Sequence, residues 1–223
     1  MNMAAQIPTA RPIDMDTYAR RNFFEYFKAF DVPVHSRTVQ IDITRAKHHI
    51  KKHGLLFSLA MTLLVTKAAN QVPEFRQRLS DCGIEEYDFI VPFYTLLTPS
   101  KAVAFILGTH ADSFGACYEA NMAIRREVMA GRVPRFDMAN QGHITVSVVP
   151  WYSFTAITMP YSRNHASVPT VSIGKFYEQQ DACMIPLAIH SNHALIDGYH
   201  VGQFLDCLTS YLADPETHMA IGA

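Results

Sequence analysis

Residues 190–200 of this 223-residue chain read HSNHALIDGYH, and this stretch decides the expected fold of the C-terminal part. It follows the apolar run Met184–Ile189, whose length suits a buried strand, and it precedes the helical spacing of Tyr199–Leu212. Polar side chains that leave a buried strand lie at the edge of a sheet, where a ligand can reach them. Gly198 favours a fixed turn there, because glycine adopts backbone angles closed to other residues. We therefore expect a functional site at residues 190–200.

An imidazole in this stretch has the chemistry of a general base. His193 stands four residues before Asp197, and an unperturbed histidine titrates at about pH 6.5, close to neutral. Two alternatives stay open on these residues alone. His193 can be an ordinary hydrogen-bonded packing residue, or it can join Asp197 and His200 in a zinc site, although the H-E-x-x-H pattern is missing.

The composition of the chain excludes several classes of protein. Hydrophobic residues make up 49% and charged residues 17%, and 14 Phe, 10 Tyr and 10 Met are too many buriable side chains for a disordered chain. The net charge is -1 without a basic stripe, so nucleic acid is not expected as a partner. The longest apolar runs, such as Leu59–Val65, are far too short to span a membrane. An even composition without repeats or linkers predicts one domain, residues 1–223, with a loose N-terminal tail at residues 1–12.

The cysteines and the N-terminus indicate a reduced compartment. The four cysteines, Cys82, Cys117, Cys183 and Cys207, are widely spaced without a C-x-x-C pair, which argues against structural zinc and against a disulfide framework. We expect them to be small buried thiols. Residues 1–12 hold one arginine and no apolar segment of the kind that a signal peptide has. We therefore expect a cytoplasmic protein.

The remaining pattern mixes helices and strands without a regular alternation. The predicted helices are Met15–Phe30, a short basic helix from Thr44 as its cap to Gly54, Ser58–Val72, a helix from Asp112 as its cap to Gly131, and Tyr199–Leu212. The predicted strands are Val39–Ile43, Phe89–Leu97, Val103–Leu107, Ile144–Val149, Tyr152–Ile157, Val171–Phe176 and Met184–Ile189. This mixture predicts an α/β two-layer sandwich with a mixed sheet. Neither G-x-G-x-x-G nor a P-loop is present to indicate a nucleotide site.

Residues 192–200 resemble the H-H-A-x-x-D-G-F/Y-H motif of the type A chloramphenicol acetyltransferases. Shorter forms of this motif occur across acyltransferases that use coenzyme A and in peptide-synthetase condensation domains, and three further segments narrow the choice. Residues 18–24 (YARRNFF) are similar to the family's W-x-R-x-x-H-F start, and Ile41–Thr44 match its first strand-to-helix junction. Residues 147–154 (SVVPWYSF) resemble its S-x-x-P-W-x-x-F segment. The similarity runs in order over about residues 15–210, so the chain is identified as a member of this family.

The resemblance implies an acetyl-CoA-dependent O-acetyltransferase that needs no metal and transfers acetyl directly in a ternary complex. His193 would take the proton of a substrate hydroxyl as that oxygen attacks the thioester. Ser147 would donate a hydrogen bond to the resulting oxyanion, which can be worth about 3 kcal/mol. Ser172 would help through a water, and Asp197 would pair with Arg20 to hold the backbone of the site.

The resemblance also implies where the co-substrate binds and how chains assemble. Trp151 and Lys175 match positions that line the CoA region of the family. The family is trimeric, with active sites at the subunit interfaces, so we expect a CoA-dependent acyltransferase-like homotrimer in which the base of one subunit faces a substrate wall of the next. Taken singly, three of these residues also fit roles without function. Ser147 can be a half-buried hydroxyl, Arg20 a solvated charge and Trp151 an aromatic side chain of the core. Outside the acceptor pocket the chain departs from the family's motifs at Tyr18, Phe23, Asn192 and Ile196.

The acceptor pocket departs from the family more than the catalytic residues do. Phe27 replaces a tyrosine at the end of the first helix, His35 adds polarity to the following loop, and Ala104 stands where a phenylalanine is usual. Met159 and Tyr161 would face the same region. One such contact shifts substrate preference by about 1–3 kcal/mol. The expected acceptor is a hydroxyl of chloramphenicol; the alternatives are another small hydroxyl compound and a non-catalytic relative that binds a small molecule.

Overall fold

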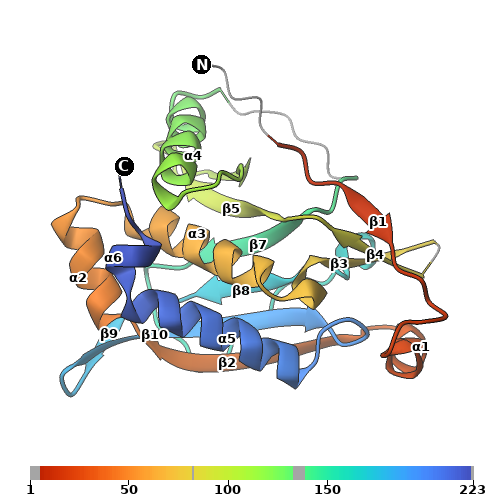
Figure 1. The fold of residues 1–223 in the computed structure, drawn as a ribbon. Coiled ribbons are helices and arrows are strands. Elements are labelled where there is room, and N and C mark those ends of the chain that lie inside the picture. The colour runs from red at the N-terminus through yellow and green to blue at the C-terminus, as the bar shows by residue number, and fades with distance from the viewer. Residues whose placement is uncertain (1–5, 82, 133–138, 222–223) are drawn as a thin grey trace.

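The computed structural model describes residues 6–81, 83–132 and 139–221, which form a layer of helices over a mixed sheet (Figure 1). The main sheet contains β2 (Val34–Asp42), β5 (Val91–Leu97), β6 (Val103–Leu107), β7 (His143–Val148), β8 (Thr170–Ile173), β9 (Tyr177–Gln179) and β10 (Ala182–Asn192). Its strand order is β2-β10-β8-β7-β5-β6, and β9 pairs with the start of β10. β7 runs parallel to both of its neighbours, and the other pairs are antiparallel. The α/β two-layer sandwich with a mixed sheet is confirmed.

The helices lie over one face of this sheet, and α1 stands apart at its end (Figure 1). They are α1 (Arg21–Lys28), α2 (Thr44–Lys52), α3 (Phe57–Asn70), α4 (Phe114–Met129), α5 (Gly198–Ala213) and α6 (Pro215–His218). The central helix α3 is apolar all round its surface, as expected for a helix enclosed on every side. It packs on β5 and β7 and against α4 and α5. None of the helices in the described ranges is long and apolar enough to cross a membrane.

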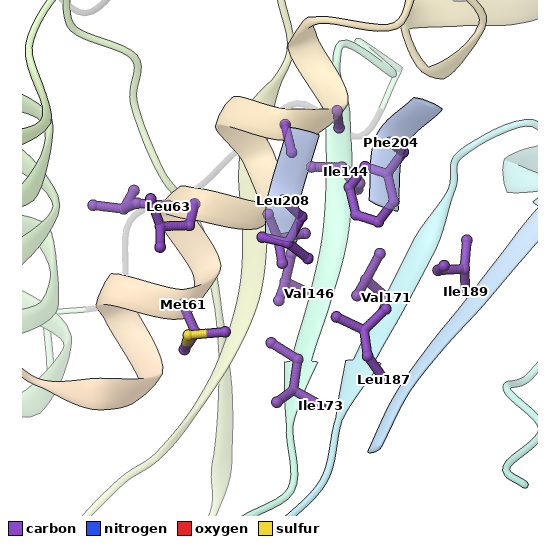
Figure 2. Close-up of a cluster of buried hydrophobic side chains, with 14 of the residues drawn as sticks. Met61, Leu63, Ile144, Val146, Val171, Ile173, Leu187, Ile189, Phe204 and Leu208 are labelled. Atoms are coloured by element: carbon purple, nitrogen blue, oxygen red, sulfur yellow. The ribbon is translucent and has the colours of Figure 1, made fainter. Parts of the chain in front are cut away.

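The core fills the space between these two layers. Met61 and Leu63 of α3 and Phe204 and Leu208 of α5 are among its buried side chains (Figure 2). Alternate residues of three adjacent strands meet them: Ile144, Val146, Val171, Ile173, Leu187 and Ile189. The other face of the same strands therefore carries the remaining residues, and none of the helices in the described part of the chain covers it.

A small second sheet has the strand order β1-β4-β3, with β1 (Ala10–Pro12), β3 (Gln77–Ser80) and β4 (Gly83–Tyr87). It corrects the expectation of a loose tail for residues 10–12, because these residues pair with β4. The backbone N–H and the hydroxyl of Thr9 also donate to the carboxylate of Asp88, at 2.9 and 2.8 Å. Residues 1–5 lie outside the described ranges.

The first helix is shorter than predicted, Arg21–Lys28 instead of Met15–Phe30. Asp14 accounts for the late start. Its carboxylate accepts from the N–H of Asp16 and from the hydroxyl of Thr17, and such local bonds give the backbone an alternative to a helical turn.

Both predicted helix caps are wrong by one residue. Thr44 does not cap α2, because its hydroxyl donates to Asp42 at 2.6 Å and the helix already includes it. Asp112 does not cap α4; the hydroxyl of Ser113 accepts from the N–H of Ala116 instead. Asp, Ser and Thr all favour this position, so neighbouring candidates cannot be separated by residue type alone.

The strand predicted at Tyr152–Ile157 is absent, since this segment has no regular structure. It runs along the surface, and the N–H of Lys175 donates to the carbonyl of Tyr152 at 2.9 Å. Alternation of apolar and polar residues marks a half-exposed segment, but a strand also needs a neighbour whose N–H and C=O groups are in register.

Candidate active site

The loop after β10 is held by hydrogen bonds of its own residues. The side chain of Asn192 accepts from the N–H of Ala194 at 2.9 Å, and its carbonyl accepts from the N–H of Ile196 at 2.9 Å. Asp197 then caps α5, because its Oδ1 accepts from the N–H of Tyr199 at 2.8 Å. Gly198 begins the helix and is not among the described glycines with positive φ, so the special turn expected there is wrong. A buried strand, a tight loop and a capped helix thus fix His193 between them.

The ring of His193 lies among three aromatic side chains. Its centroid is 5.2 Å from Phe23, 4.2 Å from Phe27 and 4.3 Å from His35. Its Nδ1 lies 3.2 Å from the carbonyl oxygen of Ile196. A carbonyl only accepts, so Nδ1 carries the hydrogen and Nε2 keeps its lone pair. Within the described part of the chain Nε2 makes no hydrogen bond, which leaves it available as a base.

His35 lies beside the candidate base, and the sequence had suggested that it contacts the acceptor. Its half-buried ring stacks on that of His193. Its Nε2 lies 2.9 Å from the carbonyl oxygen of Ile196 and 2.9 Å from the hydroxyl of Ser191. Burial first, and then the charges of His193 and Arg37, lower the pKa of His35 to about 4.

Arg20 and Asp197 form the ion pair that the resemblance implied. Nη2 of Arg20 lies 3.1 Å from Oδ2 of Asp197, with side chains 18% and 27% exposed. Arg20 also donates to the carbonyl of Leu195, so it binds the loop at two points. Burial alone would raise the pKa of Asp197, but the charge of His200, the N–H of Tyr199 and the charge of Arg20 together lower it.

Ser147 and Ser172 lie side by side on the sheet, away from the base of the same chain. They pair in register between β7 and β8, and Ser172 pairs in turn with Ala188 of β10. His193 follows five residues after Ala188, so at about 3.3 Å per residue Ser147 and His193 lie more than about 15 Å apart. The hydroxyl of Ser172 is fully buried, and no partner for it is found in the described parts of the chain. A single chain therefore does not bring the predicted base and oxyanion donor together.

Ser147 opens into a groove of about 620 Å³ between the sheet and the start of α3. Trp151, 61% exposed, lines this groove, while the exposed Lys175 follows β8 nearby in the chain. The prediction missed two further lining residues, Phe57 and Arg125. Neither lies in a recognisable motif, and only the folded sheet brings α3 and α4 to this groove.

The remaining predicted acceptor residues do not meet in one chain. Met159 and Tyr161 line a small cavity of about 60 Å³ next to Ser191, at the end of the sheet where His35 lies. Ala104 is on β6, and His35 is on β2, so they occupy opposite edges of the sheet. Of the five predicted acceptor residues, only Phe27 and His35 contact the ring of His193.

The zinc alternative gains no support from the folded chain. Among the described residues, no group of three or more His, Cys, Asp or Glu side chains could hold a metal ion. His200 instead bonds to the backbone of Asp197 at 3.1 Å. Cys117, Cys183 and Cys207 are free thiols, of which Cys183 is buried, and Cys82 lies outside the described residues.

Comparison with known proteins shows the family to which this chain belongs. Over residues 9–209 the chain matches the model of the family described as "Chloramphenicol acetyltransferase". The chain belongs to the chloramphenicol acetyltransferase family. Chloramphenicol acetyltransferases of Proteus mirabilis and Escherichia coli are 30% and 28% identical to it, over 89% and 94% of this chain and 93% and 96% of theirs. Asn192, which replaces the first histidine of the motif, shapes the loop through its bond to the N–H of Ala194.

Solved structures share the fold of this chloramphenicol acetyltransferase family member. A chloramphenicol acetyltransferase superposes with a TM-score of 0.80 at 24% identity, covering 92% of this chain and 100% of that one. The cubic core of the pyruvate dehydrogenase multienzyme complex superposes with a TM-score of 0.64 at 20% identity, covering 94% and 98%. The chain therefore shares its fold with both of these proteins.

Proposed function

We propose that this protein transfers the acetyl group of acetyl-CoA to a hydroxyl of chloramphenicol. The family match and the relatives named chloramphenicol acetyltransferase support this pair of substrates. The observation that carries the proposal is the imidazole of His193, whose Nδ1 is engaged by the carbonyl of Ile196 and whose Nε2 is free to accept a proton.

The reaction is a direct transfer in a ternary complex. Nε2 of His193 takes the hydroxyl proton as the oxygen attacks the thioester carbon, and the negative charge moves to the former carbonyl oxygen. Ser147 donates a hydrogen bond to that oxyanion. The tetrahedral intermediate then breaks its carbon–sulfur bond, and the sulfur leaves as the thiol with the proton from His193. The orphaned hydroxyl of Ser172, in register with Ser147, supports a role for it in holding a water there.

The separation of His193 from Ser147 within one chain supports a homotrimer with sites at subunit interfaces. Each site would take its base from one subunit and its oxyanion donor from the next. Within the described residues, no helix covers the sheet face that carries Ser147, and Val103, Phe105 and Trp151 are 57%, 49% and 61% exposed. Exposed apolar residues gathered on one face mark a surface for association. Sedimentation at micromolar concentration tests this, and a purely monomeric species would contradict it.

The groove beside Ser147 fits the acyl-donating arm of acetyl-CoA. Its volume of about 620 Å³ lies within the usual range for small-molecule sites. Trp151 and Phe57 offer apolar surface for the pantetheine chain. Arg125 and Lys175 supply positive charge for its phosphates.

A different small hydroxyl compound is the second candidate acceptor. His35 adds polarity beside the base, and the hydroxyl of Tyr161 is already bonded to the carbonyl of Asp31 at 3.2 Å. Both features make this region more polar than a pocket that binds an apolar acceptor. A non-catalytic relative that only binds a small molecule is the third alternative.

Release of free CoA thiol separates these possibilities. We expect release that depends on chloramphenicol, with intersecting initial-velocity lines because no acyl-enzyme forms. The His193→Ala variant should be slower by at least about 100-fold while keeping its fold and assembly. Release with other alcohols but not with chloramphenicol would favour the second candidate, and ligand binding without any release would favour the third. Expression in a sensitive bacterium then tests growth on chloramphenicol.

A further inference from the structure

We propose that His35 is a positioning residue that anchors the carbonyl of Ile196 and, through it and by stacking, the imidazole of His193. The inference rests on the proposed function, because it assigns a partner to the base of that reaction. It replaces the acceptor contact that the sequence suggested for His35.

The two imidazoles share one acceptor. Nε2 of His35 lies 2.9 Å from the oxygen of Ile196, and Nδ1 of His193 lies 3.2 Å from the same oxygen. A carbonyl oxygen has two lone pairs and donates nothing, so both histidines must present N–H groups to it. His35 therefore holds the oxygen in place for His193, and the stacked rings, 4.3 Å apart at 27°, restrict the rotation of the base.

His35 itself is held by a strand and by a buried hydroxyl. It pairs in register with Ser191 across β2 and β10. Ser191 is 3% exposed, and its hydroxyl oxygen lies 2.9 Å from Nε2 of His35. The N–H of His35 therefore makes a bifurcated hydrogen bond, to this hydroxyl and to the carbonyl of Ile196. The anchor therefore belongs to the sheet, whereas the carbonyl it holds belongs to the loop after β10.

The charge state of His35 suits this role. Burial keeps the ring neutral near pH 7, with His193 and Arg37 opposing its protonation and Asp197 favouring it. Asp197 is in turn paired with Arg20. The α1 side chains that pack on the base from the other side, Phe23 and Phe27, carry no charge. A neutral ring with its hydrogen on Nε2 keeps the carbonyl bonded across the working pH range.

Two substitutions separate the hydrogen bond from the stacked ring. His35→Phe keeps a flat ring and removes the donor, while His35→Gln keeps an N–H donor at the position of Nε2 and removes the ring. His53→Phe is the matched control: the ring of His53 lies against that of His49 at the same 4.3 Å centroid distance, tilted by 35°, but His53 is exposed and outside the site. For each assembled protein we would measure kcat, the KM of both substrates and the ¹⁵N shifts of the histidine rings, with His193 assigned from its loss in His193→Ala.

We expect His35→Phe to lower kcat about tenfold, the scale of one lost hydrogen bond, with the KM for chloramphenicol nearly unchanged. His35→Gln should recover most of that loss. The ¹⁵N shifts of His193 should show hydrogen on Nδ1 in the wild type and in His35→Gln, and a mixture of tautomers in His35→Phe. The control should match the wild type throughout.

A raised KM for chloramphenicol at unchanged kcat would overturn the proposal in favour of an acceptor contact. Unchanged kcat and unchanged shifts in His35→Phe would overturn it as well. If the wild type releases no thiol with any acceptor, the proposed function fails. The ¹⁵N shifts still show in that case whether His35 fixes the tautomer of His193.

Discussion

Arg20 and Asp197 are 177 residues apart in the chain, and their side chains form an ion pair at 3.1 Å. The pair connects the residue before α1 to the cap of α5 and encloses the loop that carries His193. Because Asp197 caps α5 with one oxygen and pairs with Arg20 through the other, the two roles can be separated by substitution.

Asp197→Asn should keep the cap and lose the ion pair. We expect a loss of about 1–2 kcal/mol in the free energy of unfolding, and about 1 kcal/mol more for Asp197→Ala, which also loses the cap. The lowered pKa of Asp197 gives the sign of the pH effect: the stabilisation is complete above the unfolded pKa of about 3.9 and is lost as the pH falls through the lower folded value. Denaturant unfolding at fixed protein concentration measures this. A difference between wild type and Asp197→Asn that grows in acid would contradict it.

His143 should make the fold sensitive to acid between pH 6.5 and 4. Burial, and then the charge of Arg78, lower its pKa to about 4 in the folded state. The unfolded chain, with a histidine pKa of about 6.5, then binds more protons in this interval, so stability is full above it and falls as the pH drops. His143→Gln should flatten the slope of unfolding free energy against pH in this window. An unchanged slope would show that His143 does not contribute to the acid sensitivity of the fold.

Arg78 is fully buried, and its guanidinium donates to four backbone carbonyls. These belong to Phe75, Gln77, Gln141 and His143. Arg78→Met leaves buried acceptors without donors, and we expect it to lower the unfolding free energy by about 2–4 kcal/mol. Arg126→Met on the exposed side of α4 is the control and should cost less than about 0.5 kcal/mol. Equal losses for the two variants would mean that the buried bonds contribute little.

Ser147→Ala should lower kcat by about 100-fold to 1,000-fold and leave the KM of acetyl-CoA within a small factor, because in the proposed mechanism the hydroxyl acts on charge that develops in the transition state. Ser210→Ala on the exposed side of α5 is a control with the same chemical change. Steady-state thiol release measures both. A rise in KM at constant kcat would assign Ser147 to ground-state binding instead.

The sequence predicted the elements whose pattern is local. The strands predicted at Phe89–Leu97 and Val103–Leu107 correspond to β5 and β6, and the apolar run Met184–Ile189 before a polar loop predicted most of β10. The hairpin of β3 and β4 was missed, because charged Arg78 and Glu85 interrupt its apolar pattern. Arg78 is nevertheless buried, since backbone carbonyls surround it, and no pattern of residue types shows that.

The candidate site was predicted as a set of residues and not as an arrangement. The pairing of Arg20 with Asp197 came from the family motif, and the structure forms it. The contact of His35 with His193 depends on the pairing of β2 with β10, which joins segments 156 residues apart. Strand order is decided by how the whole sheet packs, so no local feature near His35 could indicate that neighbour.

The distance between His193 and Ser147 has a genetic consequence. If each site forms between two subunits, two inactive chains can complement one another: a trimer that mixes His193→Ala and Ser147→Ala chains contains one interface with an intact imidazole and an intact hydroxyl. Random mixing of equal amounts would leave about a quarter of all interfaces functional. A gene for this enzyme could thus carry either lesion and still be rescued by a copy that carries the other.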